Sequence, residues 1–170
     1  MYKTITTLAM TALITASGLA QTTNAVPEQT APTAPAVAVG EWTQDYDAAK
    51  ALAKEKDLPL LLNFTGSDWC GWCILMDKQV FSTQEWKDYA KENAVLVTLD
   101  FPRDKTRVPM SYVARNQALQ KKYGISGYPT YIVVASDGEK ILGKLGASQT
   151  ATPQKFIADF KKLVDTDETK

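Results

Sequence analysis

Residues 60–73 read LLLNFTGSDWCGWC, which is the most informative segment of the chain. It begins with a short continuous apolar run at 60–64, which predicts a buried central β-strand. The residues TGSD at 65–68 predict a loop, and a helix is expected to begin near Cys70. The chain's two cysteines, Cys70 and Cys73, therefore lie where a helix follows a strand.

The spacing of these cysteines predicts redox chemistry. Two cysteines three residues apart at the start of a helix can close a disulfide across its first turn. The free backbone N–H groups and the helix dipole favour a thiolate at Cys70, so its pKa should fall below the usual value of about 8.5. We expect Cys70 to attack a substrate disulfide, and Cys73, as the more buried thiol, to resolve the mixed disulfide that forms.

Other roles for the pair fit less well. A purely structural disulfide across so short a loop would remove little entropy from the unfolded chain. The sequence has no histidine and no third cysteine, so two thiolates cannot complete a tetrahedral zinc site. Met76 and Met110 leave copper(I) as a weaker alternative, but core packing is the more typical role of methionine. We expect neither a metal nor a cofactor.

The rest of the chain predicts an α/β domain. Apolar spacing and caps predict further helices at 45–56, at 82–92 with Ser82 as N-cap, at 111–123 ended by Gly124, and from Thr152 onward. Apolar runs predict strands at 94–100, 130–134 and 141–145, the last two joined by a turn at Asp137-Gly138. Parallel crossovers followed by an antiparallel hairpin give a mixed central sheet with helices on both faces.

The N-terminal residues predict export. A signal peptide is predicted over residues 1–25, with cleavage after Ala20 or Ala25. Its typical features are the positive charge of Lys3, a short apolar stretch at 5–16 and small residues before the two cleavage points. A retained membrane anchor is the alternative. Residues 26–40, rich in Pro, Thr and Ala, predict a flexible linker, followed by a domain at 41–165 and a tail at 166–170. Export points to an oxidising compartment, the periplasm first or secretion otherwise.

Composition argues against some classes of partner. The formal net charge is zero and the isoelectric point is about 6.3, so neither nucleic acid nor an anionic membrane is an expected ligand. Arg103, Lys105 and Arg107 form a basic cluster, which Asp104 interrupts and which is read as a solvated loop. No dimerising domain accompanies residues 41–165, and a monomer is expected.

The chain resembles the thioredoxin family over nearly all of residues 41–165. The CGWC sequence at 70–73 resembles the family's redox motif, and YGISGYPT at 123–130 resembles the segment that carries its cis-proline. The resemblance implies a thioredoxin-like fold and a cis bond before Pro129, which should face the cysteines. The lead-in TGSDWC at 65–70 is similar to that of exported bacterial members.

This resemblance also implies a substrate-binding surface around the cysteines. We expect Trp69, Gly71 and Trp72 to line it, with the backbone of Tyr128 beside Pro129 free to pair with an extended substrate strand. The alternatives are core packing for the tryptophans and a trans proline that begins an edge strand.

Two features depart from the family pattern. Asn63 stands where thioredoxins carry a buried acid, and residues 95–99 lack the lysine that usually accompanies it. Proton transfer to Cys73 would then depend on water or on Asp68. In addition, neither Gly71 nor Trp72 adds a positive charge, so the strong thiolate stabilisation of a powerful oxidase is not expected.

Taken as a sequence, the chain predicts a thiol–disulfide oxidoreductase that acts on disulfides of exported proteins, as a reductase or isomerase. A reductase outside the cytoplasm would need electrons from a membrane thiol donor. The alternatives are a net disulfide oxidase and a binding module of the same fold whose groove holds a partner chain.

Overall fold

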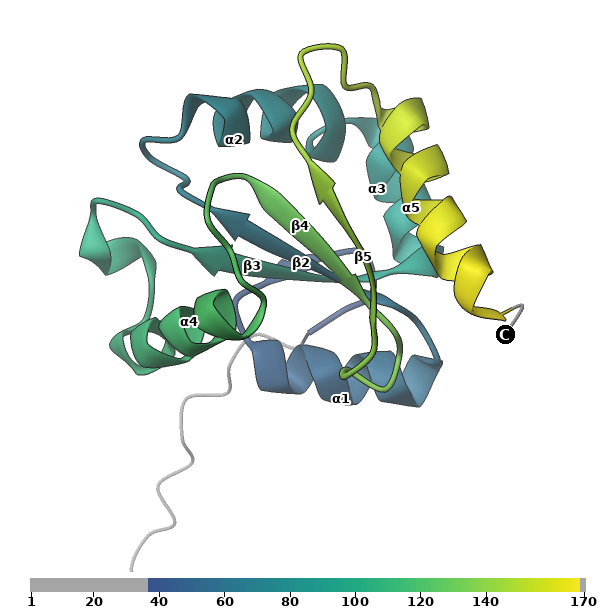
Figure 1. The fold of residues 1–170 in the computed structure, drawn as a ribbon, viewed down its shortest axis with the longest axis horizontal. Coiled ribbons are helices and arrows are strands. Elements are labelled where there is room, and N and C mark those ends of the chain that lie inside the picture. Colours follow the sequence, from purple (N-terminus) through teal and green to yellow (C-terminus); the bar gives the residue numbers. More distant parts are fainter. Residues whose placement is uncertain (1–36, 169–170) are drawn as a thin grey trace, which may run out of the picture. The chain divides into compact units, whose positions relative to one another are not determined.

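The central sheet of the computed structural model has the strand order β1-β3-β2-β4-β5 (Figure 1). The strands are Trp42–Thr43 (β1), Leu60–Thr65 (β2), Val95–Asp100 (β3), Thr130–Val134 (β4) and Ile141–Gly146 (β5). The structure describes residues 37–168, with side chains through residue 166. The predicted signal peptide and most of the predicted linker lie outside this range, as does the end of the predicted tail.

The sheet is mixed, as predicted. β3 pairs in parallel with both β1 and β2, while β4 pairs antiparallel with β2 and with β5. Every residue of β2 is buried except Asn63, and every residue of β3 is buried except Thr98. Central strands covered on both faces are apolar throughout in this way. The two-residue strand β1 was not predicted, because so short a strand leaves no periodic pattern.

Helices cover both faces of this sheet, which confirms the predicted layering (Figure 1). Helices α1 (Tyr46–Lys56) and α4 (Met110–Lys122) pack on one face, against alternate residues of the strands such as Leu62 and Val97. Helices α2 (Gly71–Met76), α3 (Gln84–Asn93) and α5 (Pro153–Glu168) pack on the other face, against residues such as Leu61 and Leu96. Successive strand residues point to opposite faces, so one apolar run supplies both cores.

The predicted N-cap of α3 is wrong. Helix α2 continues into a π-helical turn, η1 (Asp77–Phe81), and Ser82 ends that turn. The cap of α3 is Thr83, whose side chain accepts a hydrogen bond from the Trp86 backbone N–H at 3.4 Å. The sequence did not predict η1, whose Phe81 ring packs against Trp86, Tyr131 and Phe156 at centroid distances of 5.1–5.2 Å. Of the two methionines expected in the core, Met76 is fully buried, but Met110 begins α4 with 82% of its surface exposed.

Residues 37–40, at the C-terminal end of the predicted linker, contact the folded domain. Val37 and Val39 pack against the core under α1, and the Gly40 N–H donates to the Ala94 carbonyl oxygen at 3.0 Å. These contacts place residues 37–40 within the folded domain. Between residues 37 and 168, no helix is both long and apolar enough to cross a bilayer.

Candidate active site

Cys70 and Cys73 are joined by a disulfide at the start of α2, with their Cα atoms 5.2 Å apart. Cys70 is the N-cap of the helix, and its sulfur accepts a hydrogen bond from the Cys73 N–H at 3.2 Å. A reduced Cys70 at this position would have its thiolate next to an unpaired end of the helix, where negative charge is favoured. Both cysteines are 6% exposed in the disulfide form, so burial does not distinguish them as predicted.

The loop before the pair is held by backbone and side-chain contacts. The Gly66 carbonyl oxygen accepts from the Cys70 N–H at 2.9 Å, which closes the turn that leads into α2. A Cβ at position 66 would lie 2.4 Å from the Trp69 ring, so only glycine fits here. Ser67 hydrogen-bonds to the buried carboxylate of Asp100, at the end of β3. The sheet therefore fixes the position of Cys70.

Trp69 lies beside the pair but is not free to move. Its indole N–H donates to the Phe101 carbonyl oxygen at 2.8 Å, and its ring meets the Tyr128 ring edge-on at 5.8 Å. The Arg103 guanidinium lies 5.8 Å from the same ring. These contacts hold the Trp69 side chain beside the cysteine pair, with 39% of its surface exposed.

A cavity of about 330 Å³ lies between the cysteine motif and the segment that contains Pro129. Its lining includes Trp72 and residues 126–130 together with Ala147. The Tyr128–Pro129 peptide bond is cis, as predicted. Trp72 is 44% exposed, and a Cβ added to Gly71 would have no atom within 4 Å, so this side of the motif is open. Three of the expected substrate-binding residues, Trp72, Tyr128 and Pro129, thus line one opening, and their role stays a prediction.

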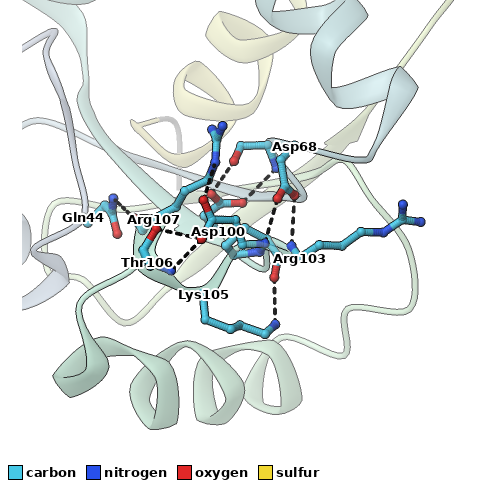
Figure 2. Close-up of polar contacts among 10 residues, drawn as sticks. Gln44, Asp68, Asp100, Arg103, Lys105, Thr106 and Arg107 are labelled. Carbon is cyan, nitrogen blue, oxygen red and sulfur yellow. Dashed lines mark hydrogen bonds and ion pairs between the residues drawn. The ribbon is translucent and has the colours of Figure 1, made fainter.

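The Asp68 side chain points towards the loop after β3 (Figure 2). Its carboxylate accepts hydrogen bonds from the backbone N–H groups of Asp104 at 2.8 Å and Arg103 at 3.0 Å. These bonds lower the pKa of Asp68, with the Asp104 N–H as the largest cause. A carboxylate stabilised in its charged form is a poor proton acceptor. The proton relay suggested for Asp68 remains untested, and this geometry argues against it.

The basic cluster belongs to the same loop. Asp104 caps the short 3₁₀ turn η2 (Lys105–Arg107), and the Lys105 ammonium donates to the Pro102 carbonyl oxygen at 2.7 Å. Figure 2 shows the Gln44 side chain contacting Arg107, whose carbonyl oxygen accepts at 3.1 Å. These polar contacts organise an exposed loop, in agreement with the prediction.

A second cavity, of about 360 Å³, touches Cys73 from the other side. Its lining comprises Trp42, Asn63, Thr65, Ser67, Cys73, Ile74, Asp77 and Thr98. Sequence reasoning missed Asp77, which lies four residues after Cys73 and hence one helical turn along the same face. That spacing was the available signal. Within the described residues, no group of three or more His, Cys, Asp or Glu side chains is placed to hold a metal ion.

Comparison with known proteins identifies relatives. Residues 41–136 match the family described as "Thioredoxin-like". "Disulfide bond reductase DsbH" of Chlamydia pneumoniae is 33% identical over 109 residues, which cover 64% of this chain and 65% of that protein. "Thioredoxin-related protein DsbJ" of the same organism is 28% identical over 126 residues, covering 74% of this chain and 36% of that protein. The chain thus spans less than two thirds of each of these relatives.

A solved structure described as "DsbH Oxidoreductase" has the same fold. It superposes with a TM-score of 0.68 and 30% identity, covering 81% of this chain and 94% of that one.

Proposed function

The chain belongs to the thioredoxin-like family, and on that premise we propose that it is a thiol–disulfide oxidoreductase that reduces disulfide bonds of exported proteins. The observation that carries this proposal is the Cys70–Cys73 disulfide at the N-terminus of α2, beside an open cavity lined by Trp72 and Pro129. Such a disulfide is the oxidised form of a dithiol, and the pair can therefore exchange two electrons with a substrate.

The reaction moves two electrons from the protein to its substrate. The Cys70 thiolate attacks a substrate disulfide, one substrate sulfur leaves and takes up a proton, and a mixed disulfide with Cys70 remains. Cys73 then loses its proton and attacks the Cys70 sulfur. The second substrate sulfur leaves as a thiolate and is protonated in turn. The protein ends as the Cys70–Cys73 disulfide of this structure.

The cavity at Pro129 suits an extended segment of a substrate protein. Trp72 and Tyr128 offer aromatic surface on its rim, and residues 126–130 offer backbone. Main-chain groups of this kind can pair with an added strand whatever its sequence. A site built in this way accepts many substrates that carry an accessible disulfide.

Two observations favour reduction over net oxidation. A relative that is 33% identical is described as a disulfide bond reductase. Moreover, the two residues between the cysteines, Gly71 and Trp72, are uncharged and add nothing to the thiolate stabilisation that makes a strong oxidant. Continued reduction outside the cytoplasm requires a donor, for which we propose a membrane protein that supplies thiols.

The place of action follows from residues 1–25, which are proposed to direct export to the periplasm. Export can be tested by fusing residues 1–40 to a reporter that folds only when its disulfides form. Reporter activity is expected with the native segment, and it should disappear when the apolar stretch at 5–16 is interrupted by charged residues. The exported domain is proposed to act as a monomer.

The decisive measurement is the reduction potential of the pair, by equilibration in dithiothreitol or glutathione buffers. A value near that of thioredoxin, about −270 mV, is expected for a reductase. A value near about −120 mV would instead identify a disulfide donor. A pair that never forms the disulfide would favour a binding module.

Single-cysteine variants assign the two sulfur atoms. Cys73→Ser should attack a disulfide substrate and accumulate the mixed disulfide, visible on a non-reducing gel. Cys70→Ser should form no such adduct. Adducts that formed at Cys73 instead would reverse the assignment of nucleophile and resolving thiol.

A further inference from the structure

The cavity behind Cys73, called the chamber below, is partly open to solvent and is lined by both polar and apolar side chains. It shares no lining residue with the cavity at Pro129. Its floor is made by Asn63 of β2 and Thr98 of β3, which are direct partners in the parallel ladder. These are also the positions at which the otherwise buried strands are only partly buried.

The chamber suits water rather than a packed side chain. Its volume of about 360 Å³ is many times the roughly 30 Å³ that one water molecule occupies. The buried Oδ1 atom of Asn63 has no hydrogen-bond partner among the described residues. A buried carbonyl oxygen of this kind is ordinarily paired, and a water molecule in the chamber would pair it.

Asp77 is the one acid on the lining of this chamber, and it shares that lining with Cys73. Its backbone N–H donates to the Cys73 carbonyl oxygen, so the two residues occupy one face of consecutive helical turns. The Asp77 carboxylate accepts from the Ser82 hydroxyl at 3.2 Å through Oδ2, which orients the group.

The surroundings of Asp77 contain little that competes for its proton. The Tyr131 hydroxyl on β4 has its pKa raised by burial and, secondarily, by the charge of Asp77, so it stays neutral at physiological pH. Lys78 follows Asp77 on the same turn and is exposed. The Asp68 carboxylate, by contrast, already accepts hydrogen bonds from the backbone N–H groups of residues 103 and 104.

We propose that Asp77 accepts, through the chamber, the proton that the Cys73 thiol loses when it resolves the mixed disulfide. This assignment rests on the proposed oxidoreductase function and gives it a proton acceptor in place of the buried acid that Asn63 replaces. The Cys73 sulfur bonds to the Cys70 sulfur as its proton passes to the Asp77 carboxylate. The bond from Cys70 to the substrate sulfur breaks, and that sulfur leaves with the electron pair and is protonated by solvent. Asp77 returns its proton to solvent at its exposed side.

The test uses Asp77→Asn, which keeps an acceptor for Ser82 and removes only the basic oxygen. Reduced protein is mixed with equimolar 5,5′-dithiobis(2-nitrobenzoate) in a stopped-flow instrument. The first release of the coloured thiolate reports attack by Cys70, and the second reports resolution by Cys73. We expect the first rate constant to change by less than about twofold and the second to fall by about 100-fold at pH 7.

The pH profile separates proton transfer from a structural role. In the unmodified protein, resolution should vary little with pH wherever the Asp77 carboxylate is ionised. In Asp77→Asn it should rise about tenfold per pH unit, because resolution then waits for the thiol to ionise. Asp77→Glu should recover most of the rate, and Asp88→Asn, which removes an exposed charge on α3, should leave both phases unchanged.

Each outcome has a distinct reading. A second phase that is as fast in Asp77→Asn as in the unmodified protein, or faster, overturns the assignment. It would show that the charge of Asp77 merely opposes ionisation of Cys73 or plays no part. Failure of the unmodified protein to give any first phase would instead overturn the proposed function, whatever Asp77 does.

Discussion

The carboxylate of Asp100 accepts two hydrogen bonds from Ser67, one from the backbone N–H at 2.9 Å and one from the hydroxyl at 2.6 Å. Asp100 is the last residue of β3 and is 7% exposed, while Ser67 belongs to the loop that leads to Cys70. This one side chain therefore ties the reactive loop to the rigid centre of the sheet.

Removing that tie should destabilise the domain. Asp100→Ala leaves the partly buried backbone N–H and hydroxyl of Ser67 without their acceptor, and we expect the free energy of unfolding to fall by about 3 kcal/mol. Ser67→Ala removes the hydroxyl bond alone and should cost about half as much. Urea denaturation of both variants measures the difference. Equal losses would show that the backbone bond contributes nothing.

Asp68 should contribute to stability in a pH-dependent way. Its pKa is lowered in the folded state by the N–H groups of Asp104 and Arg103, so its contribution is present above the unfolded value of about 3.9. It is lost as the pH falls through the lower, folded-state pKa. Asp68→Asn should therefore lower the urea midpoint at pH 7, and the gap from the unmodified protein should narrow in acid. An unchanged gap at pH 3 would contradict the assignment, with Asp88→Asn as the charge control.

Trp72 should act in substrate binding and leave the redox chemistry alone. Its half-exposed ring lines the cavity at Pro129, so Trp72→Ala should raise KM for a protein disulfide by about 3- to 10-fold. The reduction potential of Cys70–Cys73 should stay the same, because no charge changes. Ile141→Ala is the matched control, since Ile141 is 52% exposed at the far end of β5. A KM increase of the same size in both variants would refute a specific role for Trp72.

Most of the fold could be predicted because the central strands β2 and β3 are largely apolar and buried, and because the helices repeat apolar residues at helical spacing. The apolar run at 60–64 predicted β2 and the motif at Cys70 predicted the start of α2, so the residues between them had to form a short loop. What failed were features without a local signal. The π-helical turn at 77–81 looks like ordinary helix in sequence, and it transfers the capping role from Ser82 to Thr83. Val37 and Val39 lie in a stretch whose composition predicts a linker. Their burial depends on the core residues they pack against, which the local sequence does not reveal.

In the candidate site, too, some residues could be predicted from the sequence and others could not. Cys70, Cys73 and Pro129 could be predicted from motifs. The structure places the two cysteines at the N-terminus of α2, and Pro129 lines a cavity together with Trp72 of the same motif. The role proposed for Asp77 could not be predicted from the sequence, since Asp68 is nearer to Cys70 in the chain, while the cavity that Cys73 and Asp77 both line forms only in the folded domain. Asn63 in place of the family's usual acid was visible in the sequence, but the cavity beside Cys73 that Asn63 also lines was not.

The fold begins before residue 41, and two glycines can demonstrate it. Gly40 has φ +77°, and a Cβ there would lie 2.5 Å from the Lys91 backbone, whereas Gly124 has φ +60° with nothing within 4 Å of such a Cβ. Gly124→Ala should therefore cost only the left-handed strain of about 1–2 kcal/mol. Gly40→Ala should cost a further 1 kcal/mol or more, roughly the penalty of overpacking, because α3 must move to admit the methyl group. Urea denaturation compares the two variants. If residues 37–40 were a free linker, Gly40→Ala would leave the free energy of unfolding unchanged, and Gly124→Ala would be the more destabilising of the two variants.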